Sequence, residues 1–131
     1  MSKESDSPGR VVAVVADLFF KSKIRETASQ VGATLAFVST LNDLARELAA
    51  GDVTLVVIDL GIRTIDPTSA IEAAMSSPGV RTVGYVSHVD DGARSRARAA
   101  GCEVILAKSA FSNDLPRILA PGGPAGDRRT G

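Results

Sequence analysis

Four polar side chains that could carry out phosphoryl chemistry each follow a short apolar segment of the chain: Asp17, Asp59, Ser87 and Lys108. Two carboxylates can hold a hard divalent cation such as magnesium, with a backbone carbonyl near Gly61 and waters completing the shell. A carboxylate beside such a cation can attack phosphorus and form an acyl phosphate, while a lysine neutralises the transferred charge. A serine hydroxyl can then bind the new phosphoryl oxygens and shift its own loop.

Five short segments rich in β-branched residues must position these side chains: residues 11–16, 34–39, 53–58, 81–86 and 103–107. Their composition and length predict strands. The first, third and fifth have almost no polar alternation, which is typical of parallel strands that are covered on both faces. Because ligands bind beyond the carboxyl ends of such strands, we expect the four polar side chains to share one crevice.

Helical spacing fills the segments between these strands, as Ile24, Ala28 and Val31 show for the first of them. The predicted helix starts are the capping box of Thr40 and Asp43, Asp66 with Pro67, Asp90 or Asp91, and Ser112 or Asn113. The predicted helix ends are Gly32, Gly51 as a left-handed stop, the break at Pro78 and Gly79, and Gly101. Pro116 is tolerated only if it lies in the first turn of the fifth helix. Five β-α repeats predict an α/β fold, an open doubly wound parallel sheet with helices on both faces.

The composition suits one compact domain: 131 residues, 44% of them hydrophobic. The 15 basic and 15 acidic side chains cancel, so we expect no nucleic-acid or membrane partner. No apolar run approaches the roughly 20 residues of a membrane-spanning helix, no signal peptide is evident, and Cys102 is the single cysteine, which together favour a cytoplasmic location. We expect a flexible N-terminus over residues 1–9, a folded domain over 10–120, and a disordered tail over 121–131.

Residues 11–120 resemble response-regulator receiver domains, because Asp17, Asp59 within Val-Val-Ile-Asp-Leu, Ser87 and Lys108 stand in the order and approximate spacing of that family. The resemblance to these CheY-like domains implies a flavodoxin-like sheet of strand order 2-1-3-4-5. It implies the phospho-acceptor Asp59, the phosphate-sensing hydroxyl of Ser87 and the phosphate-pairing Lys108. It also implies that magnesium is bound by Asp17, Asp59 and the carbonyl of Gly61.

The resemblance further implies a phosphoryl donor, a histidine kinase or phosphotransfer protein, and a partner surface on the fourth helix, fifth strand and fifth helix. We therefore expect a stand-alone receiver of two-component signalling that phosphorylates itself at most, catalyses no turnover and acts through a separate downstream protein. A homodimer stays open. Arg94, Arg96 and Arg98 lie on the fourth helix, where Arg94 and Arg98 share one face. That basic face is the docking candidate.

Three positions depart from the receiver pattern. Ala16 stands where the family usually carries a second acid beside Asp17, so we expect weak magnesium binding. Ile105 stands at the place of the aromatic residue that swings in many receivers, and Ser109 replaces the proline that usually follows Lys108. These departures favour an alternative function, a pseudo-receiver that binds proteins independently of phosphorylation.

Each candidate residue also has an ordinary structural interpretation. Asp59 could be a turn residue, Asp17 could cap the first helix, and Lys108 could be merely solvated. His88 is expected to be an exposed loop residue, and Cys102 an inert buried thiol. A cofactor-binding enzyme on the same fold is a third hypothesis, which the lack of a glycine-rich phosphate loop after residues 11–16 disfavours.

Overall fold

The computed structural model describes residues 9–87 and 90–120, and in it a central parallel sheet alternates with helices. The strands are β1 Arg10–Val14, β2 Thr34–Phe37, β3 Val53–Asp59, β4 Arg81–Val86 and β5 Val104–Ala107. The helices are α1 Leu18–Val31, α2 Leu41–Ala50, α3 Pro67–Met75, α4 Asp91–Ala100, α5 Lys108–Asn113 and α6 Leu115–Leu119. The strand order is β2-β1-β3-β4-β5 with every pair parallel, which confirms the predicted flavodoxin-like α/β fold.

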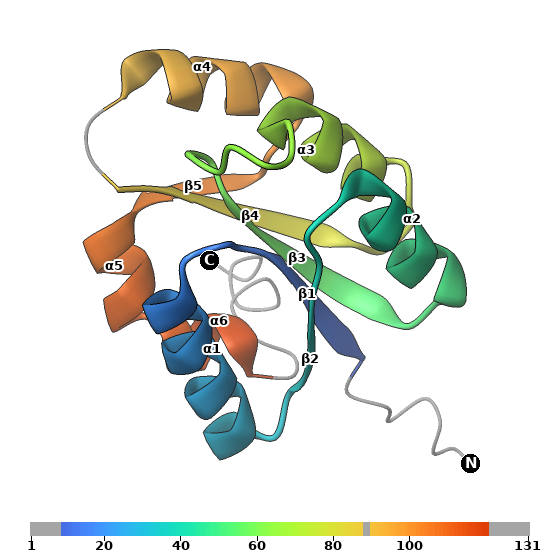
Figure 1. Ribbon diagram of the computed structural model, residues 1–131, viewed down its shortest axis with the longest axis vertical. Helices are drawn as coiled ribbons and strands as arrows, with labels where there is room; N and C mark the ends of the chain where they lie inside the picture. Colours follow the sequence, from blue (N-terminus) through green and yellow to red (C-terminus); the bar gives the residue numbers. More distant parts are fainter. Residues whose placement is uncertain (1–8, 88–89, 121–131) are drawn as a thin grey trace, which may run out of the picture.

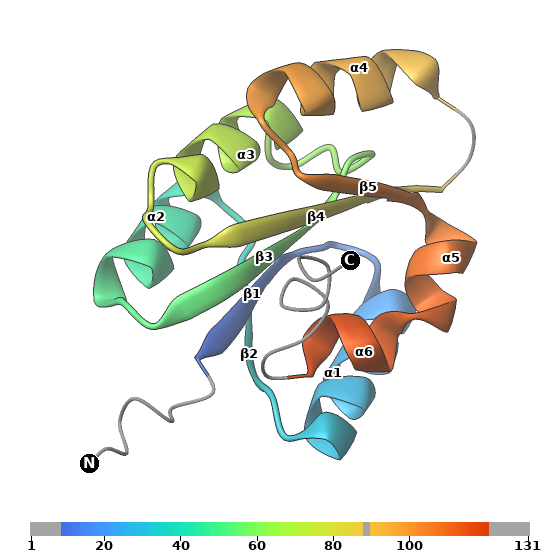
Figure 2. The same ribbon diagram turned by 180° about the vertical axis from the view of Figure 1, so that it is seen from behind.

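Helices cover the sheet on both faces: α2, α3 and α4 lie on one side, and α1, α5 and α6 on the other (Figures 1 and 2). The side chains of β3 alternate between two cores. Val56 and Ile58 belong to the cluster that includes α2, α3 and α4, whereas Leu55 and Val57 pack with residues of α1, α5 and α6. Burial on both faces explains why this strand has no polar alternation in the sequence.

Most predicted helix ends are confirmed. They are formed by hydrogen bonds between residues close in the sequence, which residue types can predict. The Thr40 hydroxyl accepts a hydrogen bond of 2.9 Å from the amide of Asp43 and so caps α2. Asp66 caps α3 with Pro67 in the first turn, and Asp90 caps α4. Among the glycines, Gly32 and Gly101 end α1 and α4 in the left-handed conformation that only glycine adopts freely. The third helix runs through Met75 and ends before Pro78 and Gly79, as predicted.

The short helix predicted after Ser112 or Asn113 is present as α6, which begins at Leu115. The prediction missed a further short helix, α5, which begins at Lys108 directly after β5 and ends before the break at Asp114. Pro116 does lie in the first turn of α6, as its missing amide requires. Lys108 is therefore a helix residue rather than part of a loop.

The fifth strand is an edge of the sheet, and its residues Val104, Ile105 and Leu106 are only partly buried. Ile105 nevertheless packs against the core on one face, and Val104 and Leu106 pack against the core on the other, as the apolar sequence predicted. One expectation about a helix end needs correction. Gly51 has the positive φ expected of a helix stop, but its ψ of 173° places it outside the left-handed helical region.

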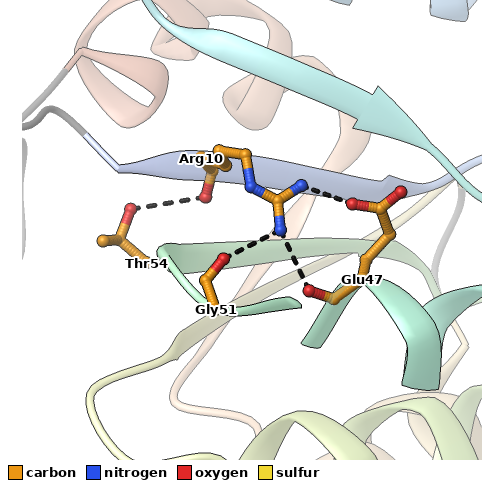
Figure 3. Close-up of polar contacts among 4 residues, drawn as sticks. All are labelled: Arg10, Glu47, Gly51 and Thr54. Carbon is orange, nitrogen blue, oxygen red and sulfur yellow. Dashed lines mark hydrogen bonds and ion pairs between the residues drawn. The ribbon is translucent and has the colours of Figure 1, made fainter. Parts of the chain in front are cut away.

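Arg10 joins the first strand to the end of α2 at the edge of the sheet opposite the carboxyl ends of the strands (Figure 3). Its guanidinium pairs with the carboxylate of Glu47 and donates hydrogen bonds of 2.9 Å to the carbonyls of Glu47 and Gly51. The backbone carbonyl of Arg10 also accepts a 3.5 Å hydrogen bond from the hydroxyl of Thr54. Helix carbonyls at this end lack intrahelical partners, so the guanidinium completes the C-terminus of α2.

Several predictions fall on residues that the structure leaves undescribed: the exposed position of His88, the disordered tail 121–131, and the flexible N-terminus apart from Gly9. Cys102 is 6% exposed, which confirms that the thiol is buried. Within the described ranges, every helix is too short or too polar to cross a membrane.

Candidate functional site

The polar residues predicted from the sequence lie at the carboxyl edge of the sheet. Asp59 is the last residue of β3, Ser87 directly follows β4, and Lys108 directly follows β5. Asp17 immediately precedes α1, three residues after the end of β1. Strand ends in a parallel sheet meet at one edge, so the fold brings together groups that are far apart in the sequence.

Asp17 caps the first helix, which confirms the structural interpretation that the sequence left open. Its Oδ1 accepts hydrogen bonds from the amides of Phe19 at 2.9 Å and Phe20 at 3.1 Å. Its Oδ2 lies 3.7 Å from the Nζ of Lys108. The amide of Phe20 in particular, with help from the Phe19 amide and the Lys108 charge, lowers the pKa of the Asp17 carboxyl, against a smaller opposing effect of burial. Asp17 is therefore an anion at neutral pH.

Asp59 is half-buried, and its Oδ1 accepts a 2.9 Å hydrogen bond from the amide of Gly61. Burial raises the pKa of the Asp59 carboxyl above its ordinary value, and the negative charge of Asp17 adds to this effect. The hydrogen bond from Gly61 and the positive charge of Lys108 act in the opposite direction. Asp17, Asp59 and Lys108 thus form one electrostatically linked group.

A cavity of about 150 Å³ opens beside Asp59. Its lining residues are Asp59, Leu60, Gly61, Val86, Ser87, Asp90 and Ala93. Three predicted site residues therefore share this cavity, whereas Asp17 and Lys108 do not line it. At about 30 Å³ for each water molecule, the space suffices for a small anion with some of its hydration.

A second cavity of about 250 Å³ continues from the first between α4 and the segment that follows β3. The two cavities share Leu60, Gly61 and Ala93, and the second reaches Asp66 and Arg96. Arg96 is thus the arginine of α4 that faces this groove. Of the three arginines of α4, Arg96 therefore lines the groove, whereas Arg94 and Arg98 do not.

Lys108 is fixed in place rather than freely solvated. Its Nζ lies 4.6 Å from the ring centroid of Phe20 and 3.7 Å from Oδ2 of Asp17. A cation above an aromatic face is attracted by the negative charge density of the ring. Phe20 belongs to α1, so the first turns of α1 and α5 together hold the ammonium group near the edge of the sheet.

Sequence reasoning missed Tyr85, which lies directly beside the site. Tyr85 is 1% exposed and is the partner of Asp59 in the pairing of β3 with β4. Its ring packs edge-on against Phe20 at 5.1 Å and stacks on Phe111 at 4.8 Å. One signal could have found it, because Tyr85 precedes Ser87 by two positions and strand side chains alternate with a period of two.

The donor set at this edge fits a magnesium ion. Magnesium is bound by few protein oxygens and keeps several waters, so Asp17, Asp59 and the carbonyl of Gly61 would suffice to hold it. Close to these carboxylates, the buried hydroxyl of Tyr85 has no hydrogen-bond partner among the described residues. Within residues 9–87 and 90–120, no cluster of three or more His, Cys, Asp or Glu side chains is suited to a metal.

No family model and no curated protein matches this chain. Solved structures do match it. A response regulator from Hahella chejuensis is 18% identical with a TM-score of 0.74, over 85% of this chain and 92% of that one. The receiver domain of a sensor histidine kinase from Pseudomonas aeruginosa PAO1, solved with a magnesium ion coordinated in its active-site cleft, is 18% identical with a TM-score of 0.72, over 85% and 93% of the two chains.

A response regulator from Burkholderia pseudomallei, solved with a phosphorylated aspartic acid, a calcium ion and citrate, is 14% identical with a TM-score of 0.72. That match covers 93% of this chain and 71% of the other. Sequence identity this low carries the fold and not the chemistry. The strand order, the two helical layers and these matches together show that the chain has the fold of a response-regulator receiver domain.

Proposed function

We propose that this chain is a receiver that accepts a phosphoryl group on Asp59 from a histidine kinase or phosphotransfer protein. The observation that carries the proposal is the position of Asp59, half-buried at the end of β3 and lining one cavity with Ser87. A carboxylate oxygen of Asp59 forms a bond to phosphorus as the bond between phosphorus and the donor breaks, and the donor's leaving group keeps that electron pair. The product is an acyl phosphate.

The surrounding residues serve this step by position and charge. The amide of Gly61 holds one oxygen of Asp59, which leaves the other for attack. Lys108 neutralises negative charge near the carboxylate, and the hydroxyl of Ser87 hydrogen-bonds a phosphoryl oxygen in the shared cavity. Magnesium, when bound by Asp17, Asp59 and the carbonyl of Gly61, supplies further positive charge for the transferring group.

Signal output passes from this cavity to α4 in our proposal. Asp90 lines the cavity with Ser87 and also caps α4 by accepting a 2.9 Å hydrogen bond from the amide of Ala93. A shift of Ser87 toward a new phosphoryl group would therefore change the surroundings of the first turn of α4. The face formed by α4, β5 and α5, with the exposed Arg98, is the surface we propose for a separate downstream protein.

A second candidate, the phosphorylation-independent pseudo-receiver, is favoured by the surroundings of Asp17. Ala16 is exposed and offers no carboxylate, so Asp17 has no second acid beside it. One oxygen of Asp17 is engaged by two backbone amides, and the other faces Lys108. Cation binding has to compete with these contacts. In this alternative, the fold binds a protein partner constitutively.

The experiment that separates the two functions is intact mass spectrometry after incubation with acetyl phosphate and magnesium. A matched control variant is available in Asp52, an exposed acid that precedes the same strand at its other end. The receiver hypothesis predicts a single phosphoryl adduct in wild type and D52N but not in D59N or without magnesium. Equal absence of the adduct from all samples would contradict it and favour the pseudo-receiver.

A further inference from the structure

The hydroxyl of Tyr85 is a buried polar group. The residue is 1% exposed, and its oxygen has no hydrogen-bond partner among residues 9–87 and 90–120. Leaving a buried hydroxyl unsatisfied disfavours the folded state, so native proteins rarely retain such groups without a bound water, an ion or a function. We therefore expect the hydroxyl to hydrogen-bond a bound water or another ligand in the native protein.

The placement of the ring limits where that ligand can lie. Tyr85 pairs with Asp59 across β3 and β4, and its side chain packs on the face covered by α1, α5 and α6. Phe20 of α1 and Phe111 of α5 hold the ring on two sides. These are the helices whose first turns carry the contacts of Asp17 and Lys108. The hydroxyl is thus confined to the space beneath the acidic site.

The pKa of the Tyr85 phenol also indicates that the hydroxyl lies near the two carboxylates. Burial first, and then the negative charges of Asp59 and Asp17, raise the pKa of the Tyr85 phenol far above its ordinary value. Both carboxylates are therefore within electrostatic reach of the hydroxyl, and the phenol stays neutral. A neutral phenol can accept one hydrogen bond and donate another, which suits a water that is bound beside a carboxylate.

We propose that the hydroxyl of Tyr85 is an outer-sphere group of the divalent-cation site, where it hydrogen-bonds a water of the cation held by Asp17 and Asp59. Metal-bound water donates its protons, so the phenol oxygen would accept a hydrogen bond from that water. Ala16 offers no side-chain oxygen to such a water, and Tyr85 supplies one from a different strand. This inference rests on the proposed function, because it assumes that Asp17 and Asp59 bind the cation.

Tyr85→Phe removes the hydroxyl and keeps the ring. Outer-shell partners typically contribute 10- to 100-fold to metal affinity, so we expect about 10-fold weaker magnesium binding in Y85F. The stability without magnesium should be unchanged or raised, because an unsatisfied buried oxygen is removed. A matched control is Ile118→Val, which removes a buried methyl group from the same core and changes neither of the aromatic contacts that hold the Tyr85 ring. It should lower stability and leave magnesium affinity near the wild-type value.

Calorimetric titration with magnesium chloride measures the affinity, and tyrosine emission provides an independent signal. Tyr85 is the single tyrosine of the chain and tryptophan is absent, so emission excited at the tyrosine band reports on this residue alone. In wild type, the emission should change over the same magnesium concentrations as the heat. A magnesium affinity of Y85F within about twofold of the wild-type affinity would overturn the inference. Wild-type tyrosine emission that does not change on addition of magnesium would overturn it as well.

The phosphoryl adduct on Asp59, measured at saturating magnesium, distinguishes this inference from the proposed function. If wild type and Y85F both form the adduct and bind magnesium equally, the role of Tyr85 is refuted and the receiver stands. If wild type forms no adduct and binds no magnesium, both proposals fail. Weaker magnesium binding by Y85F with recovery of the adduct at high magnesium supports both.

Discussion

Replacing Arg10 with methionine tests whether a contact between distant parts of the chain stabilises the fold. Methionine keeps an apolar stem along the strand and removes the guanidinium. The substitution deletes the ion pair with Glu47 and two hydrogen bonds of 2.9 Å to the carbonyls of Glu47 and Gly51 (Figure 3). The hydrogen bond from the Thr54 hydroxyl to the backbone carbonyl of Arg10 is left in place.

The expected magnitude follows from the burial of these groups. Hydrogen bonds from a charged donor contribute about 1.5–3 kcal/mol each when buried. The side chain of Arg10 is 23% exposed and that of Glu47 is 33% exposed, so water competes in part and we take roughly half of that value for each bond. The ion pair itself adds no more than about 1 kcal/mol. We therefore expect R10M to lower the free energy of unfolding by roughly 2–3 kcal/mol.

Urea unfolding followed by circular dichroism measures this loss, with R46M as the matched control. Arg46 lies on the same helix as Glu47, but its side chain is 78% exposed and its nearest acid, Asp43, is 3.7 Å away. R46M should change stability by no more than about 0.5 kcal/mol. E47Q keeps its backbone carbonyl and should lose only about 0.5–1 kcal/mol.

Equal stability of R10M and R46M would refute the argument that Arg10 holds the end of α2. A loss in E47Q as large as that in R10M would instead assign the stabilisation to the ion pair and not to the carbonyls. A changed dependence on urea concentration in R10M would show that the variant no longer unfolds from the same compact state.

Three further predictions concern other parts of the fold. Gly84→Ala would place a methyl 3.0 Å from three carbons of Leu60, so we expect a loss of about 1–3 kcal/mol in urea unfolding, and wild-type stability would disprove this close approach. Burial raises the pKa of the Cys102 thiol, so the unfolded chain ionises first as pH rises above about 8.5 and stability falls by up to about 1.36 kcal/mol per pH unit. C102A should lack that alkaline decline in unfolding measured from pH 8 to 10, and an identical decline in both proteins would argue against it. Asp90→Ala removes the cap of α4 and should lower stability by about 1 kcal/mol, whereas Asp91→Ala, one residue further on, should have a smaller effect in the same measurement.

The sequence alone determined those features that depend on neighbours in the chain. Helix caps such as Asp66 and Asp90 form hydrogen bonds to residues three positions away, so their residue types were sufficient to predict them. The strands were found by their apolar runs, and parallel strands place their ends at one edge, which predicted that Asp17, Asp59, Ser87 and Lys108 would share one crevice. Asp59 and Ser87 do line a common cavity, whereas Asp17 and Lys108 lie outside it.

Tertiary structure decided the features that depend on contacts between distant segments. The sequence indicated only that Lys108 follows the fifth strand and could be solvated, yet it begins α5 and places its ammonium group over Phe20 of α1. The pairing of Arg10 with Glu47 spans 37 positions. No local pattern encodes either contact, because the partner is set by how the helices pack on the sheet.

The same reason explains why Tyr85 was missed. In the sequence it is one aromatic residue of an apolar strand, typical of any buried core. Only the stacking of α1 and α5 around its ring, together with its pairing to Asp59, shows that a polar oxygen is buried beside two carboxylates. Residue types and spacing determine which strands and helices form, whereas the surroundings of a buried polar atom exist only once those elements have packed.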